Sequence, residues 1–339
     1  MAGAPLFSII ITTYFSEKTV RKCIDSVLAQ TEPSYEIIVI DDASQDSTVS
    51  ILKKYAQQND NIKLILHPEN HGQPFGLNEG IRAAEGKYIS FVDGDDWVSP
   101  DCYARRKASL LTVPDADILI AGFTVNRLRE DGEYETVTPP FPKNQPLTFH
   151  DMVSSVDNIH TGNHVSFSCR MLFRREFLQR ENLLKNETVV VGEDTDFNLR
   201  ALNRSKNVVV CDEVGYFYDT SNQNSIMRTR YKKTLENDIE VSYETRTAMC
   251  MDIKTYRRDL IEYYVKQWTF MVIHNQINSP EGLTPDALRR ILNLPCFRET
   301  WKATGFRLYH KGSRDLILRL LIKFRLVHLY CYLINRSRK

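Results

Sequence analysis

The 339-residue sequence predicts an α/β protein with a mostly parallel, twisted sheet flanked by helices and followed by a C-terminal helical extension. Two observations lead to this class. In the first 125 residues, short apolar runs alternate with segments of helical periodicity, which indicates right-handed βαβ crossovers. From about residue 234 onward, the apolar residues keep helical spacing.

The expected elements follow one another in a regular order. Apolar runs predict strands at residues 7–12, 36–41, 62–66, 87–92, 117–123 and 207–211. Helical periodicity and capping residues predict helices at residues 18–29, 47–55, 74–84, 193–202 and 234–276, and one that begins at Ser99-Pro100. In the helix 234–276, the aromatic residues Tyr256, Tyr263, Tyr264 and Trp268 are expected to pack in a core rather than form a sugar platform.

The composition excludes several classes of protein. The 44 basic and 43 acidic residues nearly balance, so we expect no nucleic-acid partner. Seven cysteines are scattered without a Cys-x-x-Cys pair, which argues against a zinc module or a disulfide framework and favours the reduced thiols of a cytoplasmic protein. The first five residues contain no basic segment, so we expect no signal peptide.

Three carboxylates directly follow the apolar strand 87–92. They are Asp93, Asp95 and Asp96, and Gly94 separates the first two. Two carboxylates separated by one small residue suit a hard divalent cation, which can also bind the oxygens of a diphosphate. A solvated acidic turn is the alternative interpretation.

Polar residues also follow the first two predicted strands. They are Thr12-Thr13-Tyr14 and Asp41-Asp42. Ligands of open α/β sheets bind at the carboxyl ends of the strands, near the point where the strand order reverses. The sequence therefore predicts that these residues and the acidic cluster meet in one site for a nucleotide and a metal ion.

In order and spacing, these motifs resemble those of the family 2 inverting glycosyltransferases, in particular enzymes of bacterial surface-polysaccharide synthesis. The motifs are Ser8–Tyr14, Glu36–Thr48, Asn78–Ile81 and Phe91–Trp97. The similarity is close over residues 6–125 and looser to about residue 226. It implies a GT-A type nucleotide-diphospho-sugar transferase fold, a sugar-nucleotide donor that is usually a UDP-sugar, and Mn²⁺ or Mg²⁺ as cofactor.

The resemblance assigns the nucleoside contacts by position. Thr12 and Tyr14 would border the base and the ribose. Either Asp41 or Asp42 would accept a hydrogen bond from the imide N–H of uracil, because uracil presents this donor between two carbonyls. For Asp42, an Asx turn or a helix cap is the alternative role.

Contacts to the phosphates are less complete in this sequence. Asn78 matches its motif, but Leu77 precedes it where the family usually has an arginine. Arg228 and Arg230, which follow an Asn-x-x-Ser-Ile segment, are candidates to replace that arginine at the diphosphate. An exposed basic loop is the alternative interpretation.

The resemblance also assigns the metal ligands and the acceptor side. Asp95 would bind the metal directly, while Asp93 would lie nearer the ribose or a metal-bound water, with Gly94 between them. Asp96 would shape the turn or face the acceptor, and Trp97 would also lie on the acceptor side.

The catalytic base is expected in the segment Gly192–Phe197. Acidic residues in a first helical turn are favoured by capping and by the helix dipole, so a structural role is the alternative. An inverting transfer needs a carboxylate to take the proton of the attacking hydroxyl. By resemblance, Asp194 would be this base, with Glu193 in reserve or holding the acceptor.

The sequence predicts a catalytic domain at residues 1–230 and a helical region at residues 231–339. Within the first, residues 6–125 would bind the nucleotide sugar and residues 126–230 the acceptor. The tail 313–339 contains seven basic residues and one acid, and its apolar residues share one helical face. A basic amphipathic helix on an anionic inner membrane leaflet and a helix packed on protein both fit this pattern.

Two other classes of function fit this sequence less well than a transferase. A sugar-nucleotide pyrophosphorylase-like nucleotidyltransferase should carry a glycine-rich, lysine-containing loop after the first strand, and Thr12–Ser16 offers neither. A non-catalytic scaffold would have lost the acidic residues. The acceptor is expected to be a glycan or a lipid-linked glycan, whereas the sugar, its linkage and the oligomeric state stay open.

Overall fold

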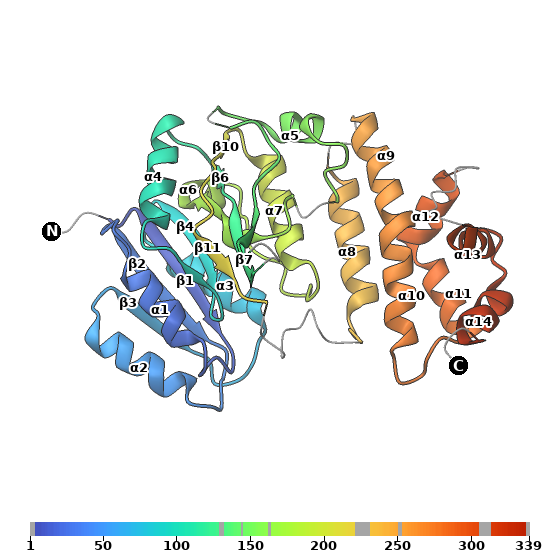
Figure 1. The fold of residues 1–339 in the computed structure, drawn as a ribbon, viewed down its shortest axis with the longest axis horizontal. Coiled ribbons are helices and arrows are strands. Elements are labelled where there is room, and N and C mark those ends of the chain that lie inside the picture. Colours follow the sequence, from blue (N-terminus) through green and yellow to red (C-terminus); the bar gives the residue numbers. More distant parts are fainter. Residues whose placement is uncertain are drawn as a thin grey trace. The chain divides into compact units, whose positions relative to one another are not determined.

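The computed structural model describes residues 4–128, 132–143, 145–161, 164–220, 231–249, 253–304 and 313–336. These residues belong to two compact units (Figure 1). The α/β unit comprises residues 1–157, 163–187 and 193–223. The helical unit comprises residues 158–162, 188–192 and 224–339.

A seven-stranded sheet forms the centre of the α/β unit, with the strand order β10-β6-β9-β4-β1-β2-β3. Its strands are β1 Phe7–Thr13, β2 Tyr35–Asp41, β3 Ile62–Leu66, β4 Tyr88–Asp93, β6 Ile118–Ile120, β9 Met171–Arg174 and β10 Val208–Val210. Neighbouring strands are parallel except at β9, which runs antiparallel to both β4 and β6. The predicted α/β class with a mostly parallel sheet is confirmed.

Helices flank this sheet (Figure 1). They are α1 Val20–Leu28, α2 Thr48–Gln58, α3 Gln73–Ala83, α4 Cys102–Thr112, α5 Phe149–Ser155, α6 Arg175–Arg180 and α7 Glu193–Arg204, with a short 3₁₀ helix at Ser168–Arg170. Helix α3 packs closely on β1 because Gly80 has no side chain: a Cβ at this position would overlap the side chain of Ile10.

The order of the central strands brings the predicted polar residues together. Strand β1 lies between β2 and β4, so the chain switches direction across the sheet at β1 and β4. In the strand register, Thr12 is opposite Asp93 and Thr13 is opposite Asp41. The carboxyl ends of three strands therefore meet at one edge, which is the expected place for a ligand in such sheets.

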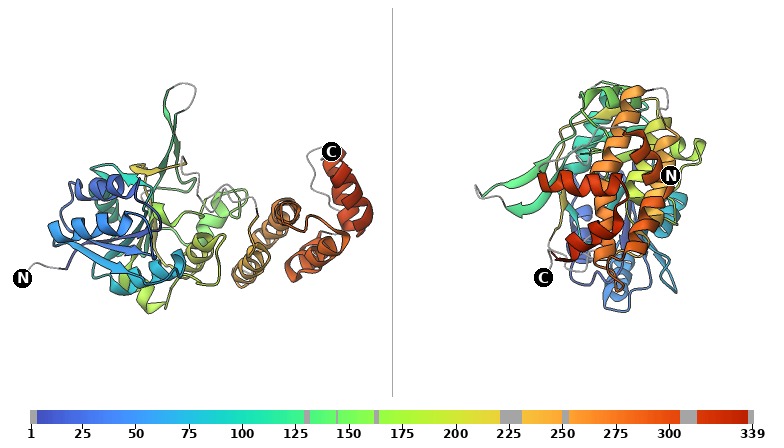
Figure 2. Two further views of the ribbon diagram at one scale, coloured as in Figure 1. Left: turned by 90° about the horizontal axis from the view of Figure 1, so that it is seen from below. Right: turned by 90° about the vertical axis from the view of Figure 1, so that its right-hand side faces the viewer.

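A second sheet follows the acidic cluster directly. Its order is β5-β11-β7-β8, and Figure 2 shows β7 and β8 extending from the α/β unit. The strands are β5 Trp97–Val98, β11 Tyr216–Tyr218, β7 Phe123–Leu128 and β8 Tyr134–Val137. The prediction of a single strand at residues 117–123 is wrong, because the chain changes sheets there: β6 ends at Ile120, and Gly122 donates its N–H to Glu213 O (2.6 Å).

The helical unit contains seven helices in its described part. They are α8 Leu235–Thr247, α9 Lys254–Tyr263, α10 Thr269–Ile277, α11 Pro285–Asn293, α12 Pro295–Ala303, α13 Ser313–Lys323 and α14 Val327–Arg336, and a π-helical segment, Tyr264–Trp268, joins α9 to α10. Tyr256, Tyr264 and Trp268 are buried in this unit. The prediction that the aromatic stripe belongs to a core is confirmed.

The C-terminal tail differs from the expected single amphipathic helix. The chain turns at Arg325, which has a φ of 54°, and the turn separates α13 from α14. Four apolar side chains of the two helices, Leu321, Ile322, Val327 and Tyr330, are buried in the helical unit. The tail is therefore, at least on this face, a packing element.

Two of the basic residues expected at a membrane surface contact the protein instead. Arg319 is 6% exposed, donates from Nη1 to Val265 O (3.1 Å) and lies over the ring of Phe270. Arg325 donates from Nη1 to Asn293 Oδ1 (2.6 Å). Within the described ranges, no helix is both long and apolar enough to cross a bilayer.

Candidate active site

The ends of β1 and β4 are joined by a side chain that the sequence analysis did not single out. Gln73, the first residue of α3, donates from Nε2 to Asp93 Oδ1 (2.8 Å) and to Thr12 Oγ1 (3.3 Å). Thr12 and Asp93 therefore meet at one point, as predicted. Tyr14 follows β1 and is 52% exposed, so its ring is available to a ligand.

The carboxylate of Asp41 holds the backbone at the end of β2. It accepts hydrogen bonds from the Thr13 hydroxyl (2.9 Å), the Ser44 N–H (2.9 Å) and the Ser44 hydroxyl (2.7 Å). Between them, Ala43 has a φ of 66°, in the left-handed region that non-glycine residues rarely adopt. Asp41 is 1% exposed and its bonds stabilise this turn, so the turn role considered for Asp42 belongs to Asp41.

Asp42 organises the loop that follows β3. Its carboxylate accepts the backbone N–H groups of His71 (2.9 Å) and Gly72 (2.8 Å). Gly72 has a φ of 87°, which suits glycine, and it lies at the start of α3. Burial disfavours the charged form of Asp42, but His67 and the two N–H groups outweigh it and lower its pKa.

His67 links Asp42 to α3. Its Nδ1 lies 2.8 Å from Asp42 Oδ1 and its Nε2 lies 2.5 Å from Glu79 Oε2. Burial opposes protonation of the imidazole, but the two carboxylates outweigh burial and raise its pKa. The sequence signal for His67 was its position directly after a predicted strand, which is the rule that found Thr12 and Asp42.

The acidic cluster after β4 carries more negative charge than its surroundings balance. Burial, together with Asp95 and Asp194, raises the pKa of Asp93 to about 7, while Lys185 acts in the opposite direction. Within the described residues, no three His, Cys, Asp or Glu side chains form a complete metal site. Excess carboxylate charge beside an incomplete set of oxygen ligands fits a divalent cation that is also bound by a diphosphate. Asp95 and Asp93 would hold such a cation.

Asp96 points into the fold. It is 1% exposed, accepts a hydrogen bond from the Tyr216 hydroxyl, and accepts the Asp219 N–H (2.7 Å). These contacts attach β11 to the end of the acidic cluster. Of the two roles expected for Asp96, shaping the turn and facing the acceptor, its burial favours the first.

Trp97 forms part of an aromatic surface of the second sheet. Its ring stacks on Phe217 with an interplanar angle of 5° and a centroid distance of 5.4 Å. Lys22 lies over the same ring. Tyr134, which is 46% exposed, approaches Phe217 edge to face. Of the three rings, Tyr134 is exposed and Trp97 and Phe217 are half-buried. Aromatic faces can pack against the apolar faces of sugar rings.

Asn78 is buried and its amide is fully used within the protein. Its Oδ1 accepts the Lys185 N–H (2.8 Å), and its Nδ2 donates to Lys185 O (3.0 Å) and to Glu187 Oε1 (2.8 Å). With 1% exposure, Asn78 does not face a ligand directly, and it holds the segment that carries Lys185. The matching motif thus serves to position a second residue.

Lys185 is a buried cation that the sequence analysis missed. Its Nζ forms an ion pair with Asp194 Oδ1 and donates to Ser168 Oγ (3.2 Å). The ammonium group lies over the rings of Phe91 and Phe197, 5.4 Å from each centroid. Burial alone would lower its pKa, but Asp194 and Glu193 outweigh burial and raise it, so Lys185 is charged.

In the Glu193-Asp194 pair at the start of α7, the pKa values of the two carboxyl groups are shifted in opposite directions. Burial disfavours a charged Asp194, but Lys185 and the Ser168 N–H, 3.0 Å from Oδ2, outweigh it and lower the pKa. Burial and the neighbouring Asp194 raise the pKa of Glu193 to about 7. Asp194 is therefore ionised at neutral pH, and 28% of its side chain is exposed.

Arg228 and Arg230 lie outside the described residues, so their predicted phosphate contacts stay a prediction. Lys185 and Gln73 had no comparable signal in the sequence. Each lies in a segment without a motif. Gln73 contacts Asp93 from the start of α3, and Lys185 is held in place by Asn78.

Comparison with known proteins assigns the family. A model of the family described as Glycosyl transferase family 2 matches residues 8–180. The chain belongs to this family. The glycosyltransferase is 31% identical to a protein named uncharacterized glycosyltransferase EpsJ of Bacillus subtilis over 332 residues, which cover 96% of this chain and 94% of EpsJ.

Two further comparisons extend this assignment. A poly(ribitol-phosphate) beta-glucosyltransferase of Bacillus spizizenii is 27% identical over 227 residues, which cover 66% of this chain and 34% of that protein. The crystal structure of S. aureus TarS 1–349 in complex with UDP-GlcNAc matches with a TM-score of 0.66 and 18% identity, over 96% of this chain and 89% of that one. The family 2 glycosyltransferase thus has the GT-A fold of these enzymes.

Proposed function

We propose that this glycosyltransferase transfers a sugar from a UDP-sugar to a hydroxyl group of a glycan or lipid-linked glycan in bacterial surface-polysaccharide synthesis, with inversion at the anomeric carbon. The observation that carries the proposal is the approach of α7 to the end of β4. Burial and Asp95 raise the pKa of Asp93 most, and the charges of Asp194 and Glu193 at the start of α7 add to this rise. A site for the donor diphosphate at Asp93 and Asp95 would therefore lie close to the proposed carboxylate base.

Donor binding would use the edge formed by β1, β2 and β4. Thr12 and Tyr14 would border the nucleoside, and Asp42 would accept the uracil imide N–H at a carboxylate lone pair that its own loop leaves unused. A neighbour with UDP-GlcNAc bound and the same fold supports uridine. A divalent cation held by Asp95 and Asp93 would neutralise charge on the leaving diphosphate.

The chemical step would be a single displacement. The acceptor oxygen forms a bond to the anomeric carbon while the bond from that carbon to the diphosphate oxygen breaks, and the electron pair leaves with the diphosphate. Asp194 would take the hydroxyl proton, because it is ionised and partly exposed. Lys185 and the Ser168 N–H would hold its carboxylate in place.

The acceptor class rests on relatives of the chain. One relative is named for adding glucose in a beta linkage to poly(ribitol-phosphate). The stacked Trp97 and Phe217 rings offer this chain a surface on which an acceptor sugar can pack. A polyhydroxylated surface polymer is therefore the class of acceptor that we propose.

The experiment that tests this function has two steps. A panel of UDP-, GDP- and CDP-sugars is first screened for thermal stabilisation of the protein with Mn²⁺, and we expect a UDP-sugar to stabilise it most. The selected donor is then incubated with oligosaccharide and polyol-phosphate acceptors, and the initial product is examined by NMR. An α-linked donor should give a β-linked product, whereas retained configuration would refute the displacement mechanism.

We also propose that the enzyme binds the anionic inner leaflet through α13 and α14. The side chains of Ile317 in α13, of Leu329 and Tyr332 in α14, and of Phe324 in the turn between these helices are about half exposed or more. Apolar side chains beside a basic segment suit an interfacial helix pair. Arg319 and Arg325 pack on protein, so the test changes apolar residues instead. The double substitution Phe324→Ser and Leu329→Ser should release the enzyme from phosphatidylglycerol vesicles in a flotation assay. Flotation unchanged by the substitutions would exclude this surface.

A further inference from the structure

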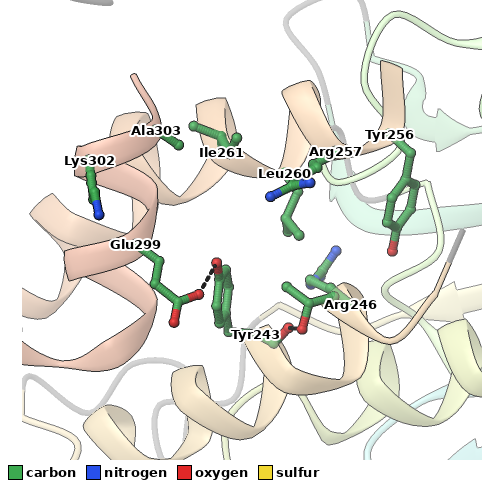
Figure 3. Close-up of a pocket in the computed structure, with 10 residues that line it drawn as sticks. Tyr243, Arg246, Tyr256, Arg257, Leu260, Ile261, Glu299, Lys302 and Ala303 are labelled. Atoms are coloured by element: carbon green, nitrogen blue, oxygen red, sulfur yellow. Dashed lines mark hydrogen bonds between the residues drawn. The ribbon is translucent and has the colours of Figure 1, made fainter. Parts of the chain in front are cut away.

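The helical unit contains an open pocket of about 570 Å³ between α8, α9 and α12 (Figure 3). Its volume lies in the range of sites for small molecules, roughly 300–1,000 Å³. No residue of the proposed catalytic site lines it. Every lining residue belongs to the helical unit.

The charges in this pocket are unequal. Arg246, Arg257 and Lys302 line it, whereas Glu299 is the one acidic residue in the lining. Glu299 accepts a hydrogen bond from the Tyr243 hydroxyl (3.1 Å). In the part of the chain that the structure describes, none of the three cations forms an ion pair. The lining therefore carries two uncompensated positive charges.

Arg246 is the most constrained of these cations, because its side chain is buried and has only neutral partners. It is 2% exposed, and its Nη1 and Nε contact His160 Nδ1 (2.6 Å) and Ser242 Oγ (3.2 Å). Burial and the nearby Arg246 hold the pKa of His160 well below its ordinary value, so the imidazole is neutral and accepts the hydrogen bond.

The second terminal nitrogen of Arg246, Nη2, makes no hydrogen bond to any described residue. A buried charge without a partner is costly, so a guanidinium group that lines a cavity and lacks a counter-ion points to an anionic ligand. The planar guanidinium can bind two oxygens of one anion at once.

The other side chains that line the pocket indicate a ligand that has a carbon skeleton in addition to an anionic group. The rings of Tyr243 and Tyr256 and the side chains of Leu260 and Ile261 enclose the same space (Figure 3). These groups can pack against carbon atoms, and Tyr243 can also exchange hydrogen bonds with hydroxyl groups. The pocket is also much larger than one phosphate ion, so its shape suits an anion attached to a polyhydroxylated carbon skeleton.

We propose that this pocket binds a phosphate ester of a sugar or a polyol. The dianionic phosphate would contact Arg246, Arg257 and Lys302. With Glu299 counted, the lining has an excess of two positive charges, which matches the charge of the phosphate. The carbon skeleton would pack between the tyrosine rings and Leu260. The pocket thus gives the helical unit a ligand-binding role of its own, in addition to the proposed sugar transfer.

The test is isothermal titration calorimetry of the full chain with glucose 6-phosphate. The titration is made with saturating UDP and Mn²⁺, so that the donor site cannot take the probe. Glucose and inorganic phosphate are titrated separately. We expect glucose 6-phosphate to bind at least about tenfold more tightly than inorganic phosphate, and glucose to show no binding, because the charge and the skeleton contribute together.

Two substitutions connect binding to the pocket. Arg257→Gln and Lys302→Gln each remove an exposed cation of the lining and should each weaken binding of glucose 6-phosphate about tenfold, the usual effect of losing a charged hydrogen bond. The matched control is Arg298→Gln, an exposed cation of α12 outside the lining, and it should leave binding unchanged. Circular dichroism melting curves check that the variants are folded.

Several outcomes would overturn the proposal. Equal affinity for glucose and glucose 6-phosphate would show that no phosphate is recognised. Equal weakening by Arg298→Gln would indicate a diffuse surface effect. Binding to phosphatidylglycerol vesicles that is lost in Arg257→Gln, without binding of the soluble ester, would assign the cations to a lipid surface instead.

Discussion

The edge of the sheet in the α/β unit and the pocket in the helical unit differ in the partners of their buried charged side chains. At the sheet edge, the cation Lys185 is paired with Asp194, and the acids Asp42 and Asp96 accept hydrogen bonds from backbone N–H groups. In the pocket, Arg246 has only neutral partners. Charges that are fixed in place suit a chemical step, whereas an unbalanced charge suits the binding of a counter-ion.

Because of this difference, we expect substitutions in the two regions to have different effects. Changes at the sheet edge should alter turnover or donor binding and leave glucose 6-phosphate binding intact. Changes in the pocket should have the reverse effect.

The largest effect is expected from Asp194→Asn. The amide keeps the shape of the side chain but cannot accept the proton, so turnover should fall by at least ~10²-fold. Affinity for the donor should stay nearly unchanged in calorimetry. The companion variant Glu193→Gln should retain much more activity. If Glu193→Gln loses more turnover than Asp194→Asn, the base is Glu193.

A second large effect is expected when Asp95 or the metal is removed. Asp95→Ala, or excess EDTA with the wild type, should abolish Mn²⁺-dependent binding of the donor, because the diphosphate charge is left without compensation. The control Asp60→Ala removes an exposed carboxylate elsewhere in the α/β unit. Donor affinity that is equal with and without metal would rule out the assignment of Asp95.

Lys185→Met should change how activity depends on pH. Lys185 lowers the pKa of Asp194, so without it that pKa should rise and the acidic limb of the kcat profile should move to higher pH. Stability should fall as well, by less than the roughly 3–5 kcal/mol of a fully buried pair, since the Asp194 side chain is 28% exposed. Lys206→Met, at an exposed lysine, is the control.

For Lys185, the profile separates a positioning role from a purely structural one. A structural role would lower kcat at every pH by the same factor, and the acidic limb would stay in place. A shifted limb would show that Lys185 sets the protonation state of the base.

The smallest effect is expected at His67, and it concerns stability. Because the folded-state pKa of His67 is raised, its pairing stabilises the protein fully below its unfolded pKa of about 6.5 and is lost as pH rises through the folded-state pKa. His67→Gln should therefore lower the free energy of unfolding by about 1 kcal/mol more at pH 5.5 than at pH 9.

Urea unfolding at the two pH values measures this difference. The exposed His150→Gln is the control, for which no pH-dependent difference is expected. A loss of stability in His67→Gln that is the same at both pH values would mean that His67 contributes through packing alone.

The two regions also differ in how much of each could be predicted from the sequence. The sequence alone determined the βαβ pattern, the three polar clusters after strands and the acidic pair at the start of α7. These are local features: an apolar run followed by carboxylates places those carboxylates at the end of a strand, whatever the rest of the chain does. The same rule could have identified His67, because it directly follows a predicted strand.

Only the tertiary structure decided the remaining features. Strand β9 is four residues long, and it lies antiparallel between β4 and β6 because it pairs with strands far from it in the sequence. Lys185 reaches Asp194 because Asn78 holds its segment, and Arg246 lines a pocket because α8, α9 and α12 pack around it. Such features depend on contacts between residues far apart in the chain, for which a local sequence pattern carries no signal.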